Sequence, residues 1–113
     1  MKIVKASFVA AAVALAVVGA GVPAQAHSGH YIYVYGGGYE RGKAKFDGGW
    51  LTVCDTRVDG KRVRAHLKSY TGNIYYSGWA PSQACTTEGH PTSIVQFRVC
   101  AESYGCSSWH NRY

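Results

Sequence analysis

Acidic residues are scarce in this sequence, which has six Asp and Glu against twelve Lys and Arg among 113 residues. The six acids fall mostly where turns and strand ends are expected, at Glu40, Asp47, Asp55, Asp59, Glu88 and Glu102. A glycoside hydrolase needs two carboxyl groups that face each other across a cleft, and a domain this short has little volume for one. The sequence also has no Gly-x-Ser-x-Gly motif, which presents the nucleophilic serine of many hydrolases. We therefore expect a protein that is not an enzyme.

Closely paired metal ligands are missing as well, since there is no Cys-x-x-Cys and no His-x-x-x-His. An even number of cysteines in a short exported chain instead predicts two disulfides, formed by Cys54, Cys85, Cys100 and Cys106. Four cysteines allow three pairings. We favour Cys54–Cys100 with Cys85–Cys106, because bridges that close longer loops constrain the unfolded chain more. The sequential pairing, Cys54–Cys85 with Cys100–Cys106, is the alternative.

Residues 1–26 have the organisation of a secretory signal peptide. Lys2 and Lys5 flank the start of an apolar run over residues 6–18, which is short for a helix that crosses about 30 Å of hydrocarbon. Ala24-Gln25-Ala26 then offers the small side chains that signal peptidase accepts. We expect a signal-peptide helix, cleavage after Ala26, and a secreted, extracellular protein that has no membrane association after cleavage.

The mature chain would begin at His27 and carry ten Lys and Arg against six Asp and Glu, a net charge of about +4. This charge is mildly basic but falls short of the clustered charge of a dedicated nucleic-acid binder. Residues 27–43 are rich in Tyr and Gly and are predicted to form a flexible arm: residues 30–35 favour an extended strand, and the glycines after them form a flexible hinge, because glycine loses the most backbone freedom on folding. Residues 44–113 are predicted to form one disulfide-stabilised β domain.

Strand patterns recur through residues 44–113. The clearest is residues 62–70, where Val63, Ala65 and Leu67 alternate with polar residues. Asp59-Gly60 favours a two-residue hairpin turn before this strand. Further strands are expected over 50–54, 74–79, 92–101 and 106–112, with a loop over 80–91. The sequence therefore predicts an all-β fold, a small antiparallel sandwich or barrel of five to six strands.

The polar face of the 62–70 strand is the predicted ligand-binding site. Cations and aromatic rings share this face and the strand that follows it, at Arg62, Arg64, His66, Lys68, Tyr70 and Tyr75. Such a row suits an anionic polymer or a saccharide. The alternative is a solvated face whose charges prevent edge-to-edge pairing of sheets. The three tryptophans, Trp50, Trp79 and Trp109, are expected to pack in the core.

A copper site is a further hypothesis. Cleavage after Ala26 would make His27 the N-terminal residue, and an amine with an imidazole chelates Cu(II) well. His30 would add another nitrogen ligand.

The segments Trp50–Asp55, Asp59-Gly60, Phe97–Cys100 and Cys106–Trp109 together resemble a group of small secreted actinobacterial proteins of unassigned function. The resemblance covers residues 48–109 and implies an exported two-disulfide β domain. The architecture is also similar to that of secreted actinobacterial α-amylase inhibitors, which bind through an exposed Trp-Arg-Tyr tripeptide. The nearest counterpart here is Trp109, Arg112 and Tyr113, which are spread apart.

These observations rank three functions. The first is a non-enzymatic protein that binds an extracellular or cell-wall component, a polyanion or a saccharide. The second is an inhibitor of an extracellular hydrolase, and the third is the copper-binding protein built on His27.

Overall fold

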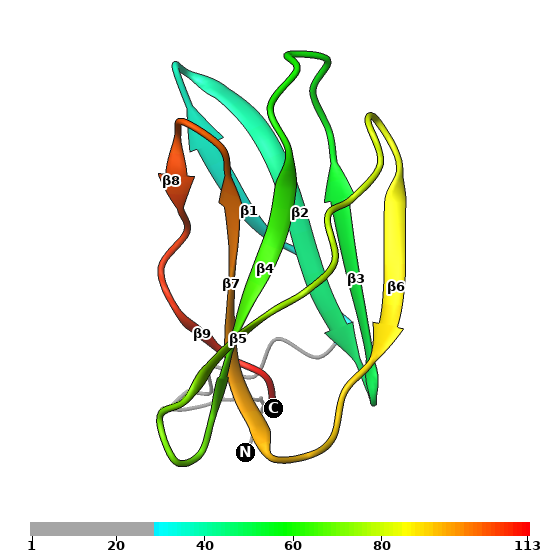
Figure 1. Cartoon of the computed structure of the whole chain (residues 1–113), viewed down its shortest axis with the longest axis vertical. Helices are drawn as coiled ribbons and strands as arrows, with labels where there is room; N and C mark the ends of the chain where they lie inside the picture. The colour runs from blue at the N-terminus through cyan, green and yellow to red at the C-terminus, as the bar shows by residue number, and fades with distance from the viewer. Residues whose placement is uncertain (1–28) are drawn as a thin grey trace, which may run out of the picture.

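Strands joined by turns and irregular loops make up residues 29–113, which is the part of the chain that the computed structural model describes (Figure 1). The predicted signal peptide and His27 lie outside the described residues. Within residues 29–113 there is no helix, and so none that could cross a membrane. The nine strands of this part are β1 (Ile32–Gly36), β2 (Tyr39–Asp47), β3 (Trp50–Asp55), β4 (Val63–Ser69), β5 (Ile74–Tyr76), β6 (Cys85–Gly89), β7 (Ile94–Ala101), β8 (Gly105–Cys106) and β9 (His110–Asn111).

The strands form two antiparallel sheets that pack face to face (Figure 1). One sheet has the order β1-β2-β3-β6, and the other has the order β5-β4-β7-β8, with β9 also paired to β7. The predicted all-β fold is thus confirmed as an open sandwich of two sheets. The expected five to six strands were too few, because β1, β2 and β6 were not counted among them.

The core lies between the sheets and is built by alternation along each strand. Phe46 and Phe97, from opposite sheets, meet edge to face with ring centroids 5.1 Å apart. In β4, Val63, Ala65 and Leu67 are buried, as their spacing predicts, and the residues between them face outward. Burial of each such aliphatic or aromatic side chain contributes about 1.5–3 kcal/mol.

The predicted flexible arm is wrong for residues 32–43, which belong to the first sheet. Ile32 and Val34 are buried in the core, and β1 pairs with β2 along its whole length. Gly37 and Gly38 have φ of +60° and +83°, which suits the tight turn of a hairpin and is costly for other residues. The glycine run is therefore a turn between two strands rather than a hinge.

Asp59-Gly60 is also not a hairpin turn. It lies between β3 and β4, which belong to different sheets, so the chain crosses the sandwich here. A salt bridge of 3.0 Å between Arg41 and Asp59 fixes this crossing against β2.

The disulfides follow the sequential pairing, and the favoured pairing is wrong. Cys54–Cys85 joins β3 to β6, and Cys100–Cys106 joins β7 to β8. Cys54 and Cys100 lie in different sheets, and each follows a core valine, so their side chains are on opposite outer faces. Two disulfides indicate an oxidising compartment.

Candidate ligand-binding site

The outer face of the second sheet carries the predicted basic row. Arg64, His66 and Lys68 project from β4, which lies between β5 and β7, so the row runs along the middle of the sheet. Successive members are about 6.6 Å apart along the strand. Arg98 joins them from β7, where it is paired with His66. Arg98 was not among the ligand-binding residues predicted from the sequence.

Aromatic rings lie against these cations. The guanidinium of Arg64 is 4.3 Å from the ring centroids of both Tyr76 and Trp79. The Lys68 ammonium and the Arg98 guanidinium lie 4.3 Å and 4.5 Å from the centroid of Trp109. Cation–π contacts of this kind hold a charged side chain in one place while leaving its charge unneutralised. We call this surface the basic–aromatic face, made of Arg64, His66, Lys68, Tyr76, Trp79, Arg98 and Trp109.

None of the three tryptophans is a core residue, which corrects the expectation that all three pack in the core. Trp79 and Trp109 are half-buried beneath cations, and Trp50 is 60% exposed on the first sheet. Trp79 and Trp109 both follow the ends of strands, where strand periodicity no longer indicates which way a side chain points.

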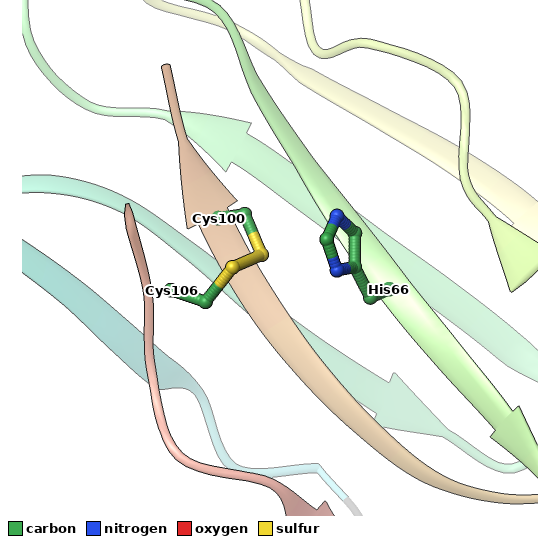
Figure 2. A group of neighbouring side chains, drawn as sticks. All are labelled: His66, Cys100 and Cys106. Atoms are coloured by element: carbon green, nitrogen blue, oxygen red, sulfur yellow. A yellow bond between two sulfur atoms is a disulfide. The ribbon is translucent and has the colours of Figure 1, made fainter. Parts of the chain in front are cut away.

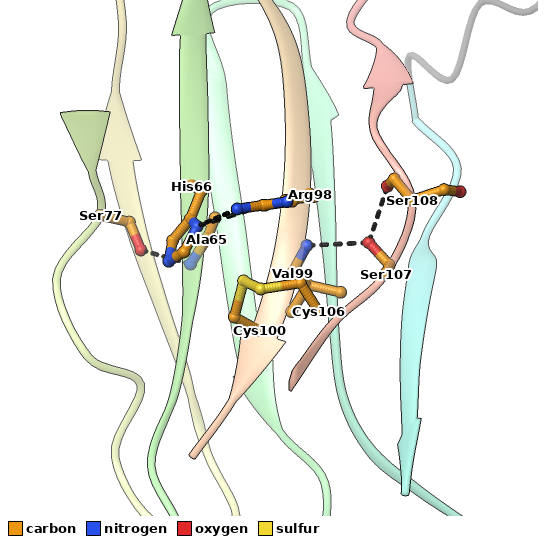
Figure 3. Close-up of a disulfide and its surroundings, with 9 residues drawn as sticks. All are labelled: Ala65, His66, Ser77, Arg98, Val99, Cys100, Cys106, Ser107 and Ser108. Atoms are coloured by element: carbon orange, nitrogen blue, oxygen red, sulfur yellow. Dashed lines mark hydrogen bonds between the residues drawn. A yellow bond between two sulfur atoms is a disulfide. The ribbon is translucent and has the colours of Figure 1, made fainter. Parts of the chain in front are cut away.

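The same local structure places both of these tryptophans. Ser77 donates its N–H to the carbonyl of Ala65 at 3.0 Å, and its Oγ accepts from the N–H of Ala65 at 2.8 Å. Ser107 makes the same two contacts with Val99, at 2.8 Å and 3.1 Å (Figure 3). Each serine Oγ then donates to the carbonyl of the next residue. In both cases a tryptophan follows two residues after the serine.

These two Ser-x-Trp motifs are related by an approximate two-fold axis. Ala65 and Val99 are paired across β4 and β7, and paired antiparallel strands are related by a local two-fold axis. Arg64 precedes Ala65, and Arg98 precedes Val99, so each arginine lies over the tryptophan of its own motif. The sheet therefore presents two equivalent Arg–Trp pairs. The repeated Ser-x-Trp is visible in the sequence. The two motifs lie at different sequence separations from their arginines, so the sequence alone does not reveal the two-fold relationship.

His66 connects the two halves of the face. Its Nδ1 accepts hydrogen bonds of 3.2 Å from Arg98, and its ring meets Tyr76 edge to face at 4.8 Å. Burial, with the positive charges of Arg98 and Arg64, lowers the pKa of His66. His66 is therefore neutral at pH 7 and orients Arg98 rather than adding a charge.

Charge compensation differs along the row. Arg62 is paired with Glu102 at 2.7 Å, and this arginine lowers the pKa of Glu102 to about 2. By contrast, Arg64, Lys68 and Arg98 form no ion pair with any carboxylate of residues 29–113. Of the predicted basic residues, Arg62 thus has a carboxylate counterion, whereas Arg64 and Lys68 have none among the described residues.

The Cys100–Cys106 disulfide lies beside His66 at one edge of the face (Figure 2). The imidazole nitrogen and the two sulfur atoms are within 4.8 Å of one another, a distance that would suit a metal. Because the two sulfurs are bonded to each other, they offer no thiolate ligand. The bridge instead ties β8 to β7 immediately before Ser107, and so helps to position Trp109.

Tyr70 and Tyr75, the remaining predicted ligand residues, lie in a cavity at the end of β4. The cavity has a volume of about 530 Å³ and is lined by Ser69, Tyr70, Thr71, Tyr75, Tyr76, His90, Pro91, Ser93 and Ile94. The structure thus divides the predicted residues between the basic–aromatic face and a tyrosine-lined cavity, which share Tyr76. Of the predicted copper ligands, His30 is exposed just before β1, and His27 lies outside the described residues.

No protein-family model, no curated protein and no solved structure matches this chain. The fold and the site define a disulfide-bonded, all-β sandwich with a basic–aromatic outer face.

Proposed function

We propose that this protein is a secreted, non-enzymatic binding protein that holds an anionic polymer on its basic–aromatic face. The observation that carries the proposal is the pair of Arg–Trp sites, in which Arg64 and Arg98 are held in equivalent positions without a carboxylate partner in the described chain. The two disulfides support an oxidising location, and the predicted signal peptide supports export to the cell surface or beyond.

The alternative of a merely solvated face explains this arrangement less well. A cation that only needs water gains nothing from being fixed, because an arginine or lysine that is held still loses side-chain entropy. Here Trp79, Trp109 and Tyr76 hold the cations in place before any ligand binds. Binding then has less conformational entropy to lose, which is the general advantage of a preorganised site.

The like charges also favour an anionic partner. Arg64, Lys68 and Arg98 lie on two adjacent strands, and their mutual repulsion raises the free energy of the unbound face. A polymer with repeated negative charges relieves this repulsion at several points at once. A single small anion would meet one Arg–Trp pair only.

Retention on an immobilised polyanion tests the proposal. Protein expressed from the full chain and purified from culture supernatant is applied to dextran sulfate, and the salt needed for elution is measured. The variant Arg64→Ser/Lys68→Ser/Arg98→Ser should lose affinity about 10- to 100-fold. The control is Lys43→Ser/Lys45→Ser/Arg57→Ser, which removes the same charge. Lys43 and Lys45 lie on β2 of the first sheet, over the ring of Tyr31. Equal losses in the two variants would reduce the effect to net charge and contradict the proposal.

A further inference from the structure

The cavity beside the basic–aromatic face has the chemistry of a sugar-binding site. Three tyrosines line it, and they are among the most exposed large side chains of the described chain, with Tyr70 at 75%. The hydroxyls of Tyr70, Tyr75 and Tyr76 make no hydrogen bond to any residue of the described chain. The three hydroxyls and the rings of Tyr70 and Tyr75 are therefore available to a ligand, whereas the Tyr76 ring already contacts His66 and Arg64.

The rest of the lining has the same mixed character. Ser69, Thr71, Ser93 and His90 complete the polar lining, which contains no Lys, Arg, Asp or Glu. The Ser69 and Thr71 hydroxyls lie 2.9 Å apart and hydrogen-bond each other, and His90 Nε2 is 3.0 Å from the Glu88 carboxylate. A pyranose ring has an apolar C–H face that packs on an aromatic ring, and hydroxyls around its edge that need hydrogen-bond partners. The volume of about 530 Å³ lies within the range of small-molecule sites, which is about 300–1,000 Å³. An uncharged sugar ring fits this cavity better than a phosphate or a carboxylate does.

Cavity and face are continuous through Tyr76. This tyrosine lines the cavity, and its ring also contacts the imidazole of His66 and the guanidinium of Arg64. A ligand seated in the cavity therefore has the Arg64 guanidinium on the other side of the Tyr76 contact, and the rest of the face beyond it.

We infer that the anionic polymer is a polysaccharide, with one sugar residue in the tyrosine cavity and acidic groups of the adjoining residues on Lys68, Arg64 and Arg98. This inference rests on the proposed function and adds the chemical class of the ligand to it. A sugar-free polyanion would use the cations alone. A single-stranded nucleic acid would stack successive bases along the row of charges, where Trp79 and Trp109 already have cations over their rings.

Calorimetric titration with two classes of probe tests the inference. The probes are acidic oligosaccharides (oligogalacturonate and a hyaluronan fragment) and, for comparison, inorganic polyphosphate and single-stranded DNA of similar charge. The variant Tyr70→Ser/Tyr75→Ser leaves Tyr76 and all cations in place. Two exposed tyrosines on β1, removed in Tyr33→Ser/Tyr35→Ser, provide the matched control.

We expect the wild type to bind an acidic oligosaccharide more tightly than either sugar-free or nucleic-acid polyanion. The cavity variant should weaken oligosaccharide binding about tenfold and leave polyphosphate binding unchanged, and the β1 variant should change neither. Unchanged oligosaccharide affinity in the cavity variant, or tighter wild-type binding of polyphosphate or DNA, would overturn the inference while leaving the proposed function intact. No binding of any of these polyanions by the wild type would overturn both.

Discussion

Ala65 on β4 and Val99 on β7 are paired with each other. Along the strand edge that faces away from this pairing, the serine of a Ser-x-Trp motif hydrogen-bonds the backbone of each residue. As a result Arg64 and Arg98, the residues before them, lie over Trp79 and Trp109 at nearly the same distance. Diagonal neighbours of this kind on an antiparallel pair are about 7–8 Å apart. This spacing is that of their backbones, and a ligand that uses both arginines must present one negative group to each Arg–Trp pair.

Equivalence of the two Arg–Trp pairs predicts equal losses on mutation. Arg64→Ser and Arg98→Ser should each reduce affinity for dextran sulfate about five- to tenfold, because each removes one held cation from the same kind of site. Surface plasmon resonance at one fixed salt concentration measures both. Loss of binding in one variant with no change in the other would show that only one pair contacts the polymer.

The two serines predict an effect on stability. Ser77→Ala and Ser107→Ala remove the Oγ acceptor from the N–H of Ala65 and of Val99, and an unsatisfied buried donor costs about 1–3 kcal/mol. The cost should be larger for Ser77→Ala, since the Ala65 contact is the more deeply buried. Urea denaturation measures the free energy of unfolding.

Ser82 provides the control for these variants, because it is exposed on a loop and makes no hydrogen bond within the described chain. Ser82→Ala should leave stability unchanged. If Ser77→Ala and Ser107→Ala also behave like Ser82→Ala, the serines do not fix the tryptophans.

His66 predicts a pH dependence of stability. The pKa of His66 in the folded protein is lowered from 6.5, so the unfolded chain takes up a proton first as the pH falls. The contribution of neutral His66 is complete above about pH 6.5 and declines as the pH falls below that value. His66→Gln should therefore flatten the stability curve between pH 5 and pH 7, as followed by urea denaturation. A curve with an unchanged slope would mean that other groups cause the dependence.

The two disulfides should differ in what their removal does. Cys54–Cys85 spans 31 residues and Cys100–Cys106 spans 6, so loop entropy predicts losses of about 4 and about 2 kcal/mol. Binding should follow the reverse order, since only Cys100–Cys106 adjoins the segment that carries Trp109. The double variants Cys54→Ala/Cys85→Ala and Cys100→Ala/Cys106→Ala, compared in thermal unfolding and dextran sulfate binding, give both rankings. If Cys54→Ala/Cys85→Ala lost more binding than Cys100→Ala/Cys106→Ala, the Cys100–Cys106 bridge would not be what positions Trp109.

Alternation was sufficient to predict the centre of the second sheet, because β4 has one buried and one solvated face. It was insufficient for β1, whose exposed positions are tyrosines, so that Tyr33 and Tyr35 look as apolar as the core residues between them. It also missed β6, a strand of small and polar residues at a sheet edge, where few side chains are buried.

Long-range contacts could not be predicted from the sequence for a different reason. Arg112 is 2% exposed, lies over Phe46, and donates to the carbonyls of Gly48, His90, Pro91 and Ile94. Nothing in the composition near the C-terminus indicates that this arginine is buried while Arg98 is not. The disulfide pairing was wrong for a similar reason, since loop entropy describes the unfolded chain and the outcome depended on which sheet each cysteine joined.

The most direct test of the account is the dependence of dextran sulfate affinity on salt. Each cation that contacts a polyanion contributes about 0.7–0.9 to the slope of log affinity against log salt concentration. The variant Arg64→Ser/Lys68→Ser/Arg98→Ser should therefore have a slope smaller in magnitude than that of the wild type by about 2, and Lys43→Ser/Lys45→Ser/Arg57→Ser should keep the wild-type slope. A slope that is unchanged in the first variant, or reduced equally in both, would contradict a polyanion site on the basic–aromatic face.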